Sequence, residues 1–95
     1  SGSLELWNLG DASRIWSLPM EVSSLQPAWR ADGQYLAVGE FGNNDVVLIR
    51  AADGKVERTF HGHSLPVLHV AFHPNGQMLA SVGVDKIDVE NVNED

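Results

Sequence analysis

Hydrophobic and polar residues alternate along several short segments of the chain. The alternation is visible in VERTF (56–60), VAF (70–72) and IDV (87–89), and DVVLI (45–49) is a run of mostly β-branched residues. A period of two is typical of half-buried β-strands, and no segment combines a helical apolar period with capping residues. Strands are therefore expected at residues 3–9, 14–18, 24–29, 34–40, 45–51, 55–60, 67–72 and 77–82, with a possible ninth at 86–92.

Turn-forming pairs separate these expected strands. They are Gly10-Asp11, Asp32-Gly33, Asp53-Gly54 and Asn75-Gly76, and the last three are residue types that tolerate the positive φ of tight hairpin turns. Pro27 lies inside an expected strand and has no backbone N–H to donate, so that strand should be weak or bulged. Short strands about ten residues apart, joined by hairpin turns, predict an all-β, antiparallel protein.

The chain also repeats itself. AWRADGQYLAVGE (28–40) aligns with AFHPNGQMLASVGV (71–84) at an offset of 43 residues. A partial copy, LELWN (4–8), aligns with VLIRA (47–51) at the same offset, and IDVEN (87–91) follows VLIRA at an offset of 40. Four short strands in each period of about 43 residues predict one four-stranded propeller blade per period.

One stretch of this repeat resembles the WD repeat of β-propellers. The residues that carry the resemblance are Phe60-His61-Gly62-His63, Val67, Val70-Ala71-Phe72, Pro74-Asn75-Gly76, Leu79-Ala80-Ser81 and Asp85, with the closing dipeptide present once as Trp7-Asn8. The resemblance covers nearly the whole chain and implies propeller blades.

The family holds each blade together with a polar relay, and the resemblance maps this relay onto named residues. His63, Ser81 and Asp85 fill three of its places; the last repeat has Glu90 in the fourth place, which Trp7 can fill only from the first, partial repeat. A turn carboxylate that accepts from an imidazole would satisfy buried polar groups and lock the loop. The middle repeat has Pro19-Met20-Glu21 in place of the Gly-His pair, so it should lack the relay.

About two blades cannot close a ring. We expect residues 1–95 to form a single unit with a partial blade at 3–18, a middle blade at 19–60 and a partial blade at 61–95. Our hypothesis is that identical chains exchange strands head to tail, three copies giving six blades or four copies giving eight. The rival hypothesis is an excised or engineered fragment of a larger propeller.

Under strand exchange two segments compete for one position. Residues 87–95 and the incoming Leu4–Asn8 of another copy would both be third strands. The tail carries Asp88, Glu90, Glu94 and Asp95, whereas LELWN has the apolar alternation, so we expect the tail to be displaced.

The resemblance implies a noncatalytic protein–protein interaction scaffold, and two loops are candidates for the binding surface. Residues 41–45 and 61–66 should lie on one face of a propeller. The candidate contact residues are Phe41, Asn43, Asn44, Ser64 and Leu65, an exposed aromatic residue among adaptable polar ones. The expected partner is an unidentified protein or peptide.

Composition narrows the classes of partner. The chain has 13 acidic and 6 scattered basic residues, a net charge of −7, and no cysteine. Acidic chains do not supply the clustered Lys and Arg that nucleic-acid binding needs. No apolar run is long enough to span a membrane and no signal peptide is present at the start, so we expect a cytoplasmic protein without nucleic-acid or membrane partners.

Two chemical readings compete with the scaffold. His61, His63, His69 and His73 suggest a metal- or small-ligand-binding ring, since imidazoles bind zinc, copper or nickel. An H-x-H pair alone is weak evidence, so we predict neither a metal nor a cofactor.

Ser81, His63 and Asp85 also superficially form a hydrolytic trio. Because the relay is expected to be buried, and because it recurs in non-enzymatic repeats, we predict no catalytic residues.

Overall fold

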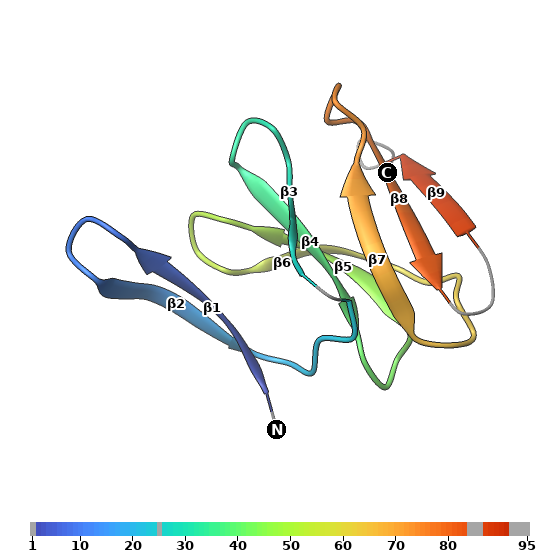
Figure 1. Cartoon of the computed structure of the whole chain (residues 1–95), viewed down its shortest axis with the longest axis horizontal. Coiled ribbons are helices and arrows are strands. Elements are labelled where there is room, and N and C mark those ends of the chain that lie inside the picture. Colours follow the sequence, from blue (N-terminus) through green and yellow to red (C-terminus); the bar gives the residue numbers. More distant parts are fainter. Residues whose placement is uncertain (1, 25, 84–86, 92–95) are drawn as a thin grey trace.

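A computed structural model describes residues 2–24, 26–83 and 87–91 of the chain, and its regular structure there consists of β-strands (Figure 1). The described part contains no helix long and apolar enough to cross a membrane. The strands are β1 (Ser3–Asn8), β2 (Ser13–Pro19), β3 (Ala28–Trp29), β4 (Tyr35–Glu40), β5 (Asp45–Arg50), β6 (Val56–Phe60), β7 (Val67–Phe72), β8 (Met78–Gly83) and β9 (Ile87–Asn91).

The strands form three antiparallel sheets in chain order. β1 and β2 make a hairpin, β3 to β6 make a four-stranded middle sheet, and β7 to β9 make a three-stranded sheet. Figure 1 shows the hairpin and the three-stranded sheet on opposite sides of the middle sheet. The all-β antiparallel prediction is confirmed.

The third strand is shorter than expected. Residues 24–29 were expected to be extended, but among the described residues of this range only Ala28 and Trp29 form strand β3 with β4, opposite Ala37 and Leu36. Pro27 precedes this pair and cannot donate to the ladder, which accounts for the late start of β3. Upstream, Val22 makes an isolated bridge with Glu40.

The first partial copy was misaligned by one residue. Leu4 pairs with Leu18, and the register shifts between Leu6 and Trp7 in β1–β2 and between Leu48 and Ile49 in β5–β6. Matching these two shifts makes Leu4–Leu18 correspond to Val46–Phe60. The offset is thus 42 rather than 43, and LELWN corresponds to VVLIR (46–50). The turns agree, because Ala12 and Gly54 both have positive φ, 61° and 75°.

The displacement of the tail is expected only under strand exchange between copies and stays a prediction; in the single chain residues 87–91 are paired. β9 lies beside β8 as the third strand, with Ala80 opposite Val89 and Val82 opposite Ile87. In a single chain no rival strand is present, and β9 satisfies the ladder groups of β8. Residues 92–95 lie outside the described residues.

Two hydrophobic clusters hold the sheets together, one on each side of the middle sheet. On the hairpin side, Leu36, Val38, Val47 and Ile49 are buried under side chains of the hairpin, which include Leu4, Trp16 and Leu18. On the other side, Ala37, Val46, Leu48 and Phe60 pack with Val67, Val70 and Leu79 of the three-stranded sheet. Strands β4 and β5, whose residues alternate between both clusters, are buried over almost their whole length because both of their faces are covered.

Candidate interaction surface

Three loop segments meet on one face of the molecule. We name residues 19–24, 40–45 and 61–66 the loop face; they lie along the lower side of Figure 1. The Phe41 N–H donates to the Glu21 carbonyl at 2.7 Å, and the Ser23 N–H donates to the Gly39 carbonyl at 2.8 Å. The side-chain amide of Asn44 donates to the Ser64 carbonyl at 3.0 Å. These bonds fix the loops relative to one another.

The predicted contact residues divide into two groups on this face. Phe41 is 58% exposed and Leu65 is 45% exposed, and Asn43 and Ser64 are also exposed. Asn44 has a left-handed backbone (φ 59°) and uses its amide to tie the two loops. Asn44 therefore holds the 40–45 loop against the 61–66 loop. The sequence pattern did not distinguish this structural role from contact with a partner.

His63 and Ser81 come together as the resemblance implied. His63 Nε2 lies 2.8 Å from Ser81 Oγ, and Ser81 is 2% exposed. Asp85, the third relay residue, lies outside the described residues. Trp7 is 51% exposed and belongs to the hairpin rather than to the three-stranded sheet that contains Ser81. A buried serine that is hydrogen-bonded to a loop histidine holds the loop in place.

Sequence reasoning missed a second histidine contact. His61 Nδ1 donates to Asp45 Oδ1 at 2.8 Å, and Asp45 is 7% exposed. The antiparallel pairing of β5 and β6 accounts for this contact. Phe60 is opposite Val46, so His61, which follows Phe60, lies opposite Asp45, which precedes Val46. This pair fastens the start of the 61–66 loop to the end of the 41–45 loop.

The histidines do not gather at one point. Among residues 2–24, 26–83 and 87–91, no three His, Cys, Asp or Glu side chains are grouped as metal ligands. His69 is exposed on β7, and His73 Nδ1 accepts the Asn75 N–H at 3.1 Å in the β7–β8 turn.

The opposite face is built from hairpin turns. Asp11, Asp32, Asp53 and Asn75 each accept, through a side-chain oxygen, the backbone N–H two residues further on, at 2.8 to 3.1 Å. We name the turns at 9–12, 30–34, 51–55 and 73–77 the turn face. The repeated bond is the Asx-turn, which explains why Asp or Asn stands in every turn.

Arginines reinforce two of these turns. Arg30 lies 2.6 Å from Asp32, and Arg50 lies 2.5 Å from Asp53. The hydrogen bond from Arg50, followed by that from the Lys55 N–H, lowers the pKa of Asp53 to about 2. In the same way the bonds from Arg30 and the Gln34 N–H lower the pKa of Asp32.

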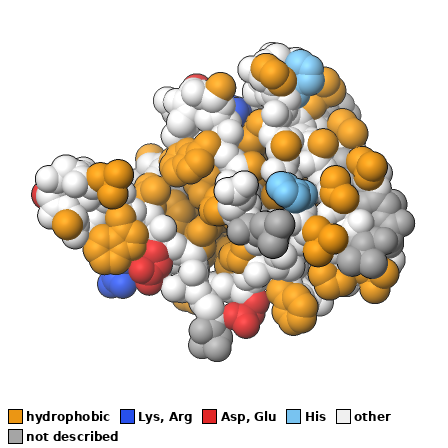
Figure 2. Space-filling view, viewed as in Figure 1, with side chains coloured by type: hydrophobic (Ala, Val, Ile, Leu, Met, Phe, Trp, Pro, Cys, Tyr) orange, Lys and Arg blue, Asp and Glu red, His pale blue; other side chains and the backbone are white. Residues whose placement is uncertain are grey.

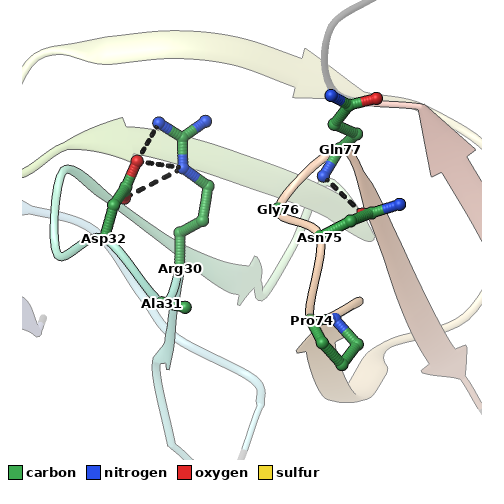
Figure 3. A pocket seen from close by; sticks show the side chains of 7 residues that line it. All are labelled: Arg30, Ala31, Asp32, Pro74, Asn75, Gly76 and Gln77. Atoms are coloured by element: carbon green, nitrogen blue, oxygen red, sulfur yellow. Dashed lines mark hydrogen bonds and ion pairs between the residues drawn. The ribbon is translucent and has the colours of Figure 1, made fainter.

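A hollow of about 390 Å³ lies between residues 30–32 and residues 74–77 (Figure 3). Its one cation, Arg30, is held by Asp32 on the same turn. The wall of this hollow is therefore neutralised internally and does not present a free charge to a ligand.

Charge differs between the two faces. The loop face contains Glu21, Glu40 and Asp45 and has no lysine or arginine, whereas the turn face contains Arg30 and Lys55 together with three aspartates, Asp11, Asp32 and Asp53. With histidine neutral, the formal charge is −3 on the loop face and −1 on the turn face.

Comparison with known sequences supports this architecture. The family model described as "WD domain, G-beta repeat" matches residues 54–87. WD repeat-containing protein 1 of Xenopus tropicalis is 34% identical over 70 residues, which are 73% of this chain and 11% of that protein. The chain spans about a tenth of the length of this curated relative.

Solved structures show the same fold. The chain matches the crystal structure of the RRP9 WD40 repeats with a TM-score of 0.84 and 25% identity, covering 95% of this chain and 29% of that one. It also matches the β-propeller domain of Cps50 (Swd1) from Myceliophteria thermophila with a TM-score of 0.74 and 16% identity, covering 96% and 33%. The three sheets therefore correspond to about a third of each matched chain.

Proposed function

Because this chain belongs to the WD-repeat family and its sheets are β-propeller blades, we propose that it is a noncatalytic scaffold whose loop face binds a protein or peptide. WD40 propellers are generally protein-interaction scaffolds. The observation that carries the proposal for this chain is the loop face itself: its segments are fixed to one another, yet Phe41 and Leu65 remain exposed. A rigid surface with apolar anchors binds without a large ordering cost.

The test uses a phage-displayed library of random peptides selected against the wild-type chain. Selected peptides are then measured against F41A and L65A, and we expect each substitution to weaken binding by about tenfold, because exposed aromatic and aliphatic anchors dominate such contacts. Val56→Ala is the matched control, since Val56 is 47% exposed but lies on β6 next to the turn face. Peptides that bind F41A and L65A as well as the wild type would place the binding surface elsewhere.

We further propose that copies of the chain assemble through exchanged blade strands. The support is that the hairpin has two strands and the three-stranded sheet lacks a fourth, so each is an incomplete blade within the described residues. Three copies would give six blades and four copies eight. Multi-angle light scattering measures the copy number directly, and a monodisperse monomer at micromolar concentration would contradict assembly.

A further inference from the structure

Within the described residues, one side of the three-stranded sheet has no other sheet packed on it, and the internal repeat shows which side this is. Ala80 pairs with Val89 and Val82 with Ile87, just as Ala37 pairs with Leu48 and Gly39 with Val46. Leu48 and Val46 are 3% and 2% exposed, whereas their counterparts Val89 and Ile87 are 60% and 72% exposed. We name this side of the three-stranded sheet the open face. Hydrophobic side chains are visible over this part of the molecule in Figure 2.

The open face carries an apolar groove. It has a volume of about 240 Å³, and its lining includes Ala71, Phe72, Met78, Ala80 and Val89. Three of these residues, Ala71, Met78 and Ala80, correspond to Ala28, Tyr35 and Ala37 of the middle sheet at the offset of 43. The strand pairs agree, since Ala28 is opposite Ala37 and Ala71 is opposite Ala80.

The middle sheet shows what fills such a groove. Phe72 of the next sheet packs into the same cluster as Ala28, Tyr35 and Ala37. The residue that corresponds to Phe72 one repeat earlier is Trp29, because Phe72 is opposite Leu79 as Trp29 is opposite Leu36.

Trp29 is available for this contact. It is 48% exposed, although its neighbour in the pair, Leu36, is 2% exposed under the hairpin. The hairpin corresponds to the outer strands β5 and β6. It therefore covers only the outer half of the side of the middle sheet on which it packs, and it leaves Trp29, on the inner strand β3, uncovered. The uncovered Trp29 and the uncovered groove are thus the two halves of one repeat contact.

We propose that Trp29 of one copy packs into the groove formed by Ala71, Met78 and Ala80 of a second copy. The contact continues the interface seen between the middle and three-stranded sheets, and it rests on the proposed self-assembly. In the same arrangement, the hairpin of the first copy takes the place of β9 beside β8 of the second. Its Leu6 then occupies the position of Val89, because Leu6 corresponds to Leu48.

Native mass spectrometry tests the contact with variants on its two sides. Trp29→Ala removes the inserted side chain, and Ala80→Arg fills the groove with a charged one. We expect wild-type copies to form trimers or tetramers and each variant alone to be a 10.4 kDa monomer. Val56→Ala is the matched control, since Val56 is 47% exposed on β6 and lies outside both halves of the contact, and it should assemble like the wild type.

Mixing the two variants separates the contact from a general loss of folding. A80R keeps its Trp29 and W29A keeps its groove, so an equimolar mixture should form a heterodimer with one intact contact and no closed ring. A wild-type assembly that W29A and A80R leave unchanged would overturn this contact while strand exchange stands. A mixture that stays monomeric would also overturn it, and a wild-type monomer would overturn assembly and contact together.

Discussion

Ala12 takes a left-handed backbone conformation at a turn position where the following repeat has glycine. Its φ is 61°, and Gly54, one repeat later, has φ 75°. The flanking bonds are the same, with Asp11 bound to the Ser13 N–H and Asp53 to the Lys55 N–H. Asp11 forms an additional bond to the Ser13 hydroxyl at 2.7 Å, which lowers the pKa of its carboxyl and helps to hold the turn. The turn thus keeps its geometry in spite of an unfavourable residue.

Replacing Ala12 with glycine should stabilise the chain. An alanine in the left-handed conformation lowers the free energy of unfolding by about 1–2 kcal/mol. Glycine removes this strain but lowers the free energy of unfolding by about 0.5–1 kcal/mol, because its unfolded chain has more conformational freedom. We therefore expect the free energy of unfolding to rise by about 0.5–1 kcal/mol, measured by urea denaturation. Ala52→Gly is the control, because φ is not positive at Ala52 and only the entropic loss should remain. A decrease for A12G similar to that for A52G would show that the turn is not strained.

Gly54 cannot take the reverse substitution. A Cβ on Gly54 would lie 2.6 Å from Cδ2 of Trp16, whose indole N–H donates to the Ala51 carbonyl at 2.7 Å. The same glycine thus serves the turn and the contact between the hairpin and the middle sheet.

Among the elements, the ladder of β5 and β6 continues past the strands into the loop face. His61 and Asp45 lie opposite one another just beyond the Phe60–Val46 pair. His61 is largely exposed at its side chain, 76%, while the Asp45 side chain is 10% exposed. The exposed His61 ring thus donates to the Asp45 carboxylate, which is mostly removed from water.

A double-mutant cycle should detect this pair. We expect H61A and D45N each to destabilise the chain, and a coupling energy of about 1 kcal/mol between them, because a hydrogen bond to a charged group contributes about 1.5–3 kcal/mol at most and His61 is exposed. Urea unfolding of the two single variants and the double variant gives the coupling. H69A serves as the control for loss of an exposed histidine. Additive effects would mean that the pair does not contribute to stability.

Local patterns predicted most of the strands, while contacts between sheets depended on register. Alternation in 56–60 and the turn pairs at 32–33, 53–54 and 75–76 placed their elements within about a residue of their positions. The offset of the hairpin copy depended on strand pairing, because the equivalent register shifts after Leu6 and after Leu48 set it at 42 rather than 43. The His61–Asp45 contact depends on the register of β5 against β6, which places Asp45 opposite the residue after Phe60, and alternation alone does not specify that register.

At the scale of the whole molecule, the middle sheet is the part that is complete. Both of its faces are covered, and its close approach to the next sheet leaves no room for a side chain at Gly39, where a Cβ would lie 2.7 Å from that of Val67. The outer sheets are each covered on one side by the middle sheet. Stability therefore depends on what covers their other sides.

Thermal unfolding should reveal this dependence. If copies assemble, mass action stabilises the folded state as concentration rises, by about 1.4 kcal/mol for each tenfold change in free partner. For a domain of this size the midpoint should rise by several degrees per tenfold increase, measured by calorimetry. W29A should show a midpoint independent of concentration, and the same independence in the wild type would contradict assembly.

β6 limits where a strand of another chain can pair with this molecule. It is the outer strand of the middle sheet, and Glu57 and Arg58 lie at its centre, with the Arg58 guanidinium 4.8 Å from the centre of the Phe60 ring. Charged residues on an edge strand oppose the addition of a further strand from another chain. The middle blade is thereby protected from edge-to-edge aggregation, and new strands are directed towards the outer sheets, where a blade is still incomplete.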